Sequence, residues 1–232
     1  MRLKSIEALF SAEIKPYLNH NRSLLRWQGE NVKMPPEPFQ NEKGVSVARR
    51  IIWINDEICP ELVEQVERRI RKLNRKSAAP IQVFINSPGG STTDSLAIYD
   101  LFRSSRAPIH ATVIADAASG ASIVLLGGDK RRILANSRIF IHNVTHWLED
   151  KSLDHRGAKR ILEGIKALRG RLLGVYCKHL KANRGKIIRW MDKETYFYAD
   201  EALRIGFVHE IVKSKKDKPF PKKKKGKKKR KR

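Results

Sequence analysis

Short apolar runs alternate with longer segments of helical periodicity along the middle of the chain. The apolar runs predict buried strands and cover residues 49–54, 81–85, 109–114, 133–134, 138–142 and 207–212. Between them, apolar residues recur every three or four positions, which predicts helices over residues 61–73, 95–102, 119–126, 154–181 and 200–204. Strands that alternate with helices form right-handed βαβ units. We therefore expect an α/β fold with a mostly parallel sheet.

Composition divides the chain into three parts. Residues 46–213 carry the regular alternation and are predicted to form the folded domain. Residues 1–45 show little strand pattern, but apolar residues at helical spacing predict a short amphipathic helix near residues 4–14. Residues 214–232 hold 13 lysines and arginines against one acid, Asp217. A segment of that composition cannot bury a core and is predicted to be disordered.

The net charge of +25 is high for 232 residues, and only part of it comes from the tail. The tail from Lys215 to Arg232 could hold nucleic acid or an acidic surface without sequence preference, or it could serve only as a solubilising segment. No apolar run reaches the length of a membrane span, and the N-terminus lacks the apolar stretch of a secretory signal. Cys59 and Cys177 have no metal-ligand spacing and favour two thiols in a reducing compartment.

Two glycines follow the strand predicted over residues 81–85, in the sequence Asn-Ser-Pro-Gly-Gly that ends at Gly90. Glycines at this place allow a tight turn and a close approach of the backbone to a ligand, so that N–H groups can face a carbonyl oxygen. An ordinary turn would have the same sequence. Both interpretations stay open on this motif alone.

Ser119 follows the strand predicted over residues 109–114 and begins an apolar helix, between Ala118 and Gly120. A nucleophilic serine needs a turn that exposes its hydroxyl, small neighbours and a free N–H on the next residue. A serine that merely caps a helix would also stand here. Ser122 is the competing nucleophile, but one turn into the helix its side chain should point elsewhere.

His142 ends the strand predicted over residues 138–142. A single histidine at a strand end is usually structural. Together with an elbow serine in the same α/β sheet, it becomes a candidate general base.

These motifs resemble, in order and approximate spacing, those of the Clp protease proteolytic subunit. The matching segments are residues 85–90, 98–100, 117–119, 136–142, 199–202 and 206–208. The resemblance implies a crotonase-like ββα spiral, with the helix over residues 154–181 as a handle between stacked heptameric rings. It implies Ser119 as nucleophile, His142 as general base, and the N–H groups of Gly90 and Gly120 as the oxyanion hole. It further implies unfolded polypeptide substrates, a separate ATP-dependent (AAA+) unfoldase, and no metal or cofactor.

The chain departs from the family at several of these positions. Glu194 stands where the triad acid is usually Asp, and Asp192 is the alternative acid. Gly120 stands where the family commonly has Met, and Asn143 with Val144 replaces the usual Gln-Pro after the histidine. Residues 1–45 are longer than the family's axial gate; a gate, a propeptide and a docking segment all fit.

Three other functions compete with an active peptidase. The first is a catalytically silent subunit of a mixed ring, which the Asp-to-Glu change keeps open. The second is an acyl-CoA hydratase or isomerase of the same fold, against which the serine and histidine argue. The third is a nucleic-acid-binding scaffold that uses the basic tail. We expect a cytoplasmic protein, with an organelle stroma or matrix as the alternative.

Overall fold

The computed structural model describes residues 50–145 and 154–212. Its elements follow in the order β1 (Ile51–Ile54), α2 (Pro60–Lys76), β2 (Ile81–Ser87), α3 (Thr92–Arg103), β3 (Ile109–Ala118), α4 (Gly120–Leu126), β4 (Lys130–Leu134), β5 (Arg138–Ile141), α5 (His155–His179), α6 (Arg184–Asp192), β6 (Thr195–Tyr198), α7 (Ala199–Ile205) and β7 (Glu210–Val212). The helix predicted near residues 4–14, the N-terminal extension and the basic tail lie outside the described residues.

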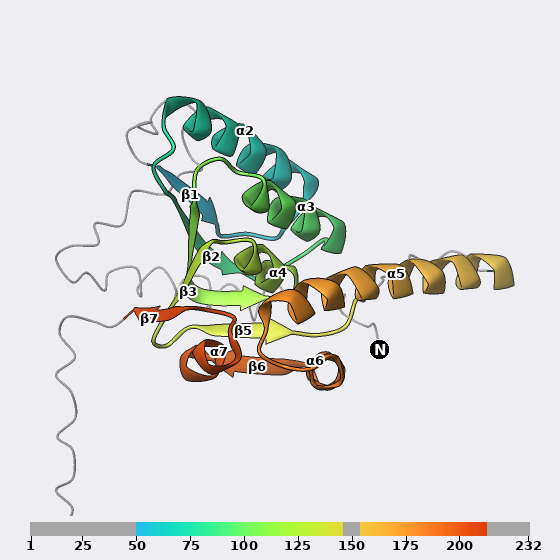
Figure 1. Cartoon of the computed structure of the whole chain (residues 1–232). Helices are drawn as coiled ribbons and strands as arrows, with labels where there is room; N and C mark the ends of the chain where they lie inside the picture. Colours follow the sequence, from blue (N-terminus) through green and yellow to red (C-terminus); the bar gives the residue numbers. More distant parts are fainter. Residues whose placement is uncertain (1–49, 146–153, 213–232) are drawn as a thin grey trace, which may run out of the picture. The chain divides into compact units, whose positions relative to one another are not determined.

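A mostly parallel sheet forms the centre of the described part, as predicted (Figure 1). Its strands run in the order β1-β2-β3-β4-β7, all parallel, and β6 pairs antiparallel on the edge of β5. The sheet forks along β3. The first half of β3 pairs with β4, whereas Asp116–Ala118 pair with Arg138–Phe140 of β5. The fork brings the end of β5 beside the end of β3.

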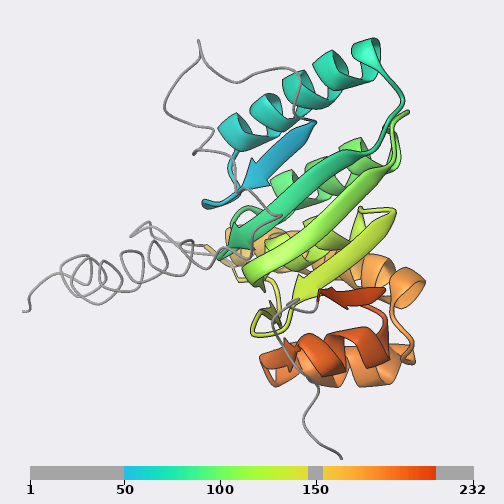
Figure 2. The same ribbon diagram turned by 90° about the vertical axis from the view of Figure 1, so that its left-hand side faces the viewer.

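Helices α2, α3, α4 and α5 follow one another across one face of the sheet, and Figure 2 looks onto the opposite face. Alternation along β2 matches this arrangement, because Ile81, Val83 and Ile85 are fully buried while the residues between them are half-buried. Helix α4 is buried on every side, which explains its almost wholly apolar sequence. The main core therefore lies between the sheet and this row of helices.

The ends of the helices carry the expected capping residues. Helix α2 begins with a proline and ends with two basic residues. The side chains of Ser91 and Asp154 accept backbone N–H bonds at the starts of α3 and α5. Local sequence thus specifies where these helices begin.

Helix α5 is buried only near its C-terminal end, at Leu172, Leu173 and Tyr176. Its N-terminal half extends away from the rest of the domain (Figure 1). Ile161 and Ile165 are half-buried there, and Leu162 is 50% exposed. The apolar stripe predicted for this helix therefore continues beyond the core that covers it.

Helix α6 and strand β6 were not predicted from the sequence pattern. Helix α6 buries only Ile187 and Met191, and β6 buries Phe197 and leaves Tyr196 and Tyr198 exposed. So few buried positions produce no clear periodicity. Strand β6 pairs with β5, and α6 contacts β6 and α5.

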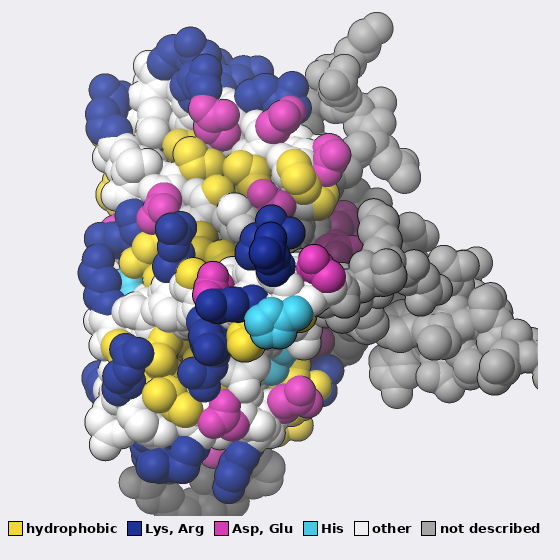
Figure 3. Space-filling view, turned by 90° about the vertical axis from the view of Figure 1, so that its right-hand side faces the viewer, with side chains coloured by type: hydrophobic (Ala, Val, Ile, Leu, Met, Phe, Trp, Pro, Cys, Tyr) yellow, Lys and Arg dark blue, Asp and Glu magenta, His cyan; other side chains and the backbone are white. Residues whose placement is uncertain are grey.

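Lys and Arg side chains are spread over the face of the molecule that the N-terminal end of α5 points toward, with hydrophobic patches between them (Figure 3). None of the helices in the described part is long and apolar enough to cross a membrane.

Candidate active site

Three of the predicted motifs meet at one edge of the sheet. Strands β2, β3 and β5 are parallel neighbours, so their carboxyl ends lie at the same edge. The Gly89–Gly90 turn follows β2, Ser119 follows β3, and His142 follows β5. Crevices at the carboxyl ends of parallel strands are the usual ligand sites of open α/β sheets.

Ser119 occupies a strained turn between β3 and α4. Its backbone has φ 52° and ψ −123°, a region that non-glycine residues rarely adopt. Its N–H donates to the carbonyl of Phe140 on β5 at 2.8 Å, and its side chain makes no capping bond to the helix. The hydroxyl is therefore not a helix cap, and the half-buried side chain is directed away from the helix backbone.

The hydroxyl of Ser119 pairs with His142. Ser119 Oγ and His142 Nε2 are 2.7 Å apart, which is hydrogen-bond distance. The imidazole also stacks on Phe140, with ring centroids 5.3 Å apart. The pairing predicted between an elbow serine and a strand-end histidine is thus present in the geometry.

Gly90 and Gly120 present backbone N–H groups beside this pair. Gly120 is the first residue of α4, where an N–H has no intrahelical acceptor. Neither N–H hydrogen bonds to any other residue in the described ranges. A Cβ atom on Gly89 would lie 2.7 Å from Ser119 Cβ and 2.9 Å from Gly120 N, so only glycine allows this turn to approach the serine so closely.

Glu194 lies on the surface, in the turn between α6 and β6. Its backbone is left-handed, with φ 51°, and its side chain is exposed. Within the described residues no carboxylate hydrogen bonds to His142, so neither Glu194 nor Asp192 accepts a bond from the imidazole in this conformation.

Asp192 instead belongs to a polar network on the residue after the histidine. Asn143 Nδ2 donates to Asp192 Oδ1 at 2.9 Å, and Arg169 Nε donates to Asn143 Oδ1 at 2.8 Å. Arg169 also reaches Asp192 Oδ1 at 3.1 Å. The hydrogen bond from Asn143, followed by the bond and charge of Arg169, lowers the pKa of Asp192. The network ties the His142 segment to α5 and α6.

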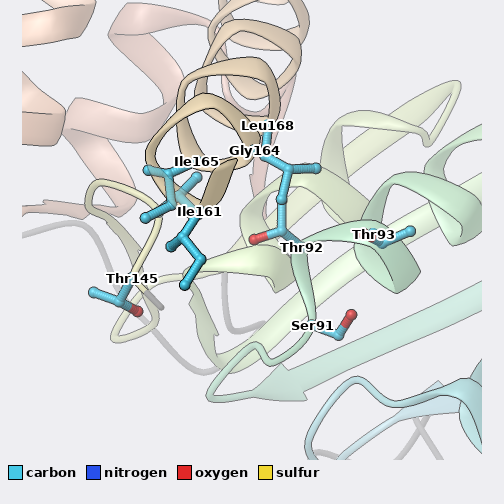
Figure 4. A pocket seen from close by; sticks show the side chains of 9 residues that line it. Ser91, Thr92, Thr93, Thr145, Ile161, Gly164, Ile165 and Leu168 are labelled. Carbon is cyan, nitrogen blue, oxygen red and sulfur yellow. The ribbon is translucent and has the colours of Figure 1, made fainter. Parts of the chain in front are cut away.

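An open cavity of about 320 Å³ adjoins the site (Figure 4). Ser91, Thr92 and Thr93 line it directly after Gly90, and Val144 and Thr145 line it just after His142. Helix α5 contributes Ile161, Gly164, Ile165 and Leu168, and Ile161 lies between Thr92 and Thr145 in Figure 4. The cavity is thus lined by aliphatic side chains of α5 and by hydroxyl-bearing residues of the segments that follow Gly90 and His142.

The family model for Clp protease matches residues 40–215. The chain belongs to the Clp protease family. A curated relative, the ATP-dependent Clp protease proteolytic subunit of Deinococcus radiodurans, is 30% identical over 167 residues, which cover 70% of this chain and 80% of the relative. Membership confirms the resemblance that the sequence motifs indicated.

A solved structure of this family has the same fold. A ClpP1 mutant from Listeria monocytogenes superposes with a TM-score of 0.66 at 24% identity, over 73% of this chain and 94% of that chain. The predicted α/β fold of the Clp protease type is therefore confirmed.

Sequence reasoning missed two groups of residues around this Clp protease site. One is the network of Asn143, Arg169 and Asp192: the sequence suggested Asp192 only as an acid and Asn143 only as a departure from the family, and it gave no sign of Arg169. The other is Ser122, considered only as a competing nucleophile. It is fully buried and bonded to the Ser119 carbonyl, so its hydroxyl is not free to act as one. The sequence pattern gave no indication of its partner Tyr176 beyond an apolar position in α5.

Proposed function

We propose that this protein is a serine peptidase that hydrolyses peptide bonds of unfolded polypeptides. The observation that carries the proposal is the 2.7 Å contact between Ser119 Oγ and His142 Nε2 at a strained strand-to-helix turn. A nucleophile within hydrogen-bond reach of a base is the arrangement that acyl transfer requires. The N–H groups of Gly90 and Gly120, which bond to no other described residue, supply the stabilisation of an oxyanion.

In this mechanism Ser119 Oγ attacks the carbonyl carbon of the peptide while its proton moves to Nε2 of His142. The resulting oxyanion accepts hydrogen bonds from the N–H groups of Gly90 and Gly120. The carbon–nitrogen bond then breaks as Nε2 gives the proton to the leaving amine, which leaves an ester on Ser119. Water attacks this ester with His142 as base, and the proton finally returns to Ser119 as the carboxylic acid departs.

We assign the acid of the triad to Glu194, with Asp192 as the alternative. Asp192 already accepts two hydrogen bonds, from Asn143 and Arg169, whereas the exposed Glu194 side chain makes no hydrogen bond to another described residue. Glu194 is thus the carboxylate that can turn toward Nδ1 without breaking an existing network. Its role would be to hold the tautomer in which Nε2 accepts the serine proton.

The peptidase would work as stacked heptameric rings around a chamber, fed by a separate AAA+ unfoldase. The extended half of α5, with Leu162 exposed and Ile161 and Ile165 incompletely covered, provides an apolar surface for contacts between subunits. The cavity against the same helix would take an apolar substrate side chain.

A catalytically silent subunit of a mixed ring is the second candidate function. The observation that favours it is the absence of a carboxylate on His142 within the described residues. A serine–histidine pair without its acid loses much of its rate, because the tautomer and orientation of the imidazole are no longer held.

Covalent labelling of the assembled protein distinguishes the two candidates. A fluorophosphonate probe should label the wild type, and Ser119→Ala and His142→Ala should both abolish labelling. Ser104→Ala removes an exposed serine hydroxyl at the end of α3 and is the matched control. A correctly assembled wild type that stays unlabelled would refute the peptidase proposal and favour the silent subunit.

A further inference from the structure

A buried pair of hydroxyl groups lies behind the nucleophile. Ser122 Oγ is 2.7 Å from the Ser119 carbonyl oxygen, and Tyr176 Oη is 2.7 Å from Ser122 Oγ. Ser122 is fully buried and Tyr176 is 1% exposed. The two residues come from α4 and α5 and are 54 positions apart in the chain.

The direction of the two hydrogen bonds follows from the number of protons. A carbonyl oxygen can only accept, so Ser122 must give its single hydroxyl proton to the Ser119 carbonyl. Tyr176 must therefore donate to Ser122. Burial raises the pKa of Tyr176 well above its ordinary value, so the phenol keeps the proton that it donates. The edge-to-face contact with Phe207, at 6.1 Å between ring centroids, holds the ring in place.

The bond to the Ser119 carbonyl also orients the N–H of Gly120. The carbonyl of Ser119 and the N–H of Gly120 belong to one planar trans peptide and point in opposite directions. Ser122 therefore fixes the orientation of this peptide by two bonds to the Ser119 carbonyl oxygen. Its hydroxyl donates at 2.7 Å and its backbone N–H donates at 3.0 Å. At the opposite edge of the same peptide plane, the Gly120 N–H then points toward the position of the oxyanion in the proposed mechanism.

We propose that Ser122 and Tyr176 are positioning residues that aim the oxyanion-hole N–H of Gly120. The relay runs from Tyr176 on α5 through Ser122 to the strained turn at Ser119. Strained conformations persist where the surrounding structure holds them in more than one way, and this relay supplies such a hold from the long helix. The inference rests on the proposed peptidase function.

The test uses the full-length assembled protein, with Ser122→Ala, Tyr176→Phe and the double variant. Loss of one oxyanion donor costs on the order of 10²–10³ in kcat. Ser122→Ala leaves the donor in place but removes its support, so we expect kcat on a fluorogenic peptide to fall roughly 10- to 100-fold with KM unchanged. Tyr176→Phe should lower kcat less, because Ser122 keeps its bond to the carbonyl.

The double variant separates positioning from mere stability. Ser122→Ala leaves the buried Tyr176 hydroxyl without its partner, which is destabilising, whereas removal of both hydroxyls is close to neutral. We expect the double variant to regain the unfolding midpoint of the wild type while its kcat stays as low as that of Ser122→Ala. Tyr99→Phe is the matched control, since it removes another buried tyrosine hydroxyl, one bonded to His179, and should leave kcat unchanged.

Each outcome bears on one proposal. A double variant whose kcat returns together with its stability would show that the pair only packs the core, and would overturn the relay. A wild-type kcat in Ser122→Ala would overturn it as well. A wild type that neither hydrolyses peptides nor reacts with a fluorophosphonate fails the peptidase proposal itself, and the relay falls with it.

Discussion

The contact between Gly120 and Ser95 leads to a quantitative prediction. Gly120 stands where the family commonly has a methionine, and its backbone is not in the left-handed region that favours glycine. What excludes a side chain is space: a Cβ atom on Gly120 would lie 2.1 Å from Ser95 Oγ and 3.0 Å from Ser95 Cβ. Ser95 is fully buried in α3 and its hydroxyl donates to the Ser91 carbonyl at 2.8 Å.

We therefore expect Gly120→Ala to destabilise the protein and Ser95→Gly to reverse that effect. In the single variant the serine hydroxyl must move, which loses a hydrogen bond worth about 0.5–1.5 kcal/mol and adds overpacking of about 1–3 kcal/mol. The better helix propensity of alanine returns up to about 1 kcal/mol. The net cost is about 0.5–4.5 kcal/mol. In the Ser95→Gly background both opposing contacts are gone, so the same change should be nearly neutral.

Urea unfolding of the four proteins of this double-mutant cycle measures the coupling. All four are compared at one protein concentration, because assembly makes apparent stability depend on concentration. The expected coupling energy equals the net cost of Gly120→Ala alone, about 0.5–4.5 kcal/mol. Additivity within about 0.5 kcal/mol would refute the reasoning, since residues that do not compete for space add independently.

Three further predictions concern α5 and the carboxylates near the site. Gly170→Ala should raise the free energy of unfolding by about 1 kcal/mol in a thermal melt, because nothing lies within 4 Å of the added Cβ and alanine is the better helix former. Burial, then the nearby Arg131, lowers the pKa of His179 to about 4. Since the unfolded chain binds that proton near pH 6.5, stability should fall as the pH drops from about 6.5 to about 4, and His179→Gln should flatten this part of the curve. If Glu194 is the acid, Glu194→Gln should lower kcat by about 10²–10⁴-fold. Asp192→Asn should then affect kcat far less, and the reverse order would assign the acid to Asp192.

The elements that the sequence predicts well are those with many buried positions. Helix α2 shows its periodicity because Leu62, Val66, Ile70 and Leu73 all face the core. Strand β3 continues four residues beyond the predicted end, from Ala115 to Ala118, because small residues without a strong pattern still pair with β5. Periodicity therefore predicts the elements that bury many side chains in the core, and it misses strand segments at the edges of the sheet.

The residues of the site also fall into those that the sequence pattern predicts and those that it does not. The serine, the histidine and the two glycines could be placed together, because each follows a parallel strand and the carboxyl ends of such strands share an edge. The position of Glu194 could not be deduced, because it lies in a turn between α6 and β6, the two elements without a sequence signal. The network on Asn143 escaped notice for a similar reason, since its partner Asp192 is on α6 and its partner Arg169 is a polar residue in the middle of the long helix α5.

Both contacts behind the nucleophile involve a residue that looks unremarkable by itself. Gly120 differs from the usual methionine, and Ser95, 25 positions earlier, fills the space that its side chain would need. From the sequence, Ser122 looks like a second candidate nucleophile. In the structure Tyr176 donates to the Ser122 hydroxyl, and Ser122 donates its own proton to the Ser119 carbonyl. In each case the role of the residue depends on a partner from a different helix. A departure from the family at one position is therefore no evidence of a lost function until the residue that packs against it has been considered.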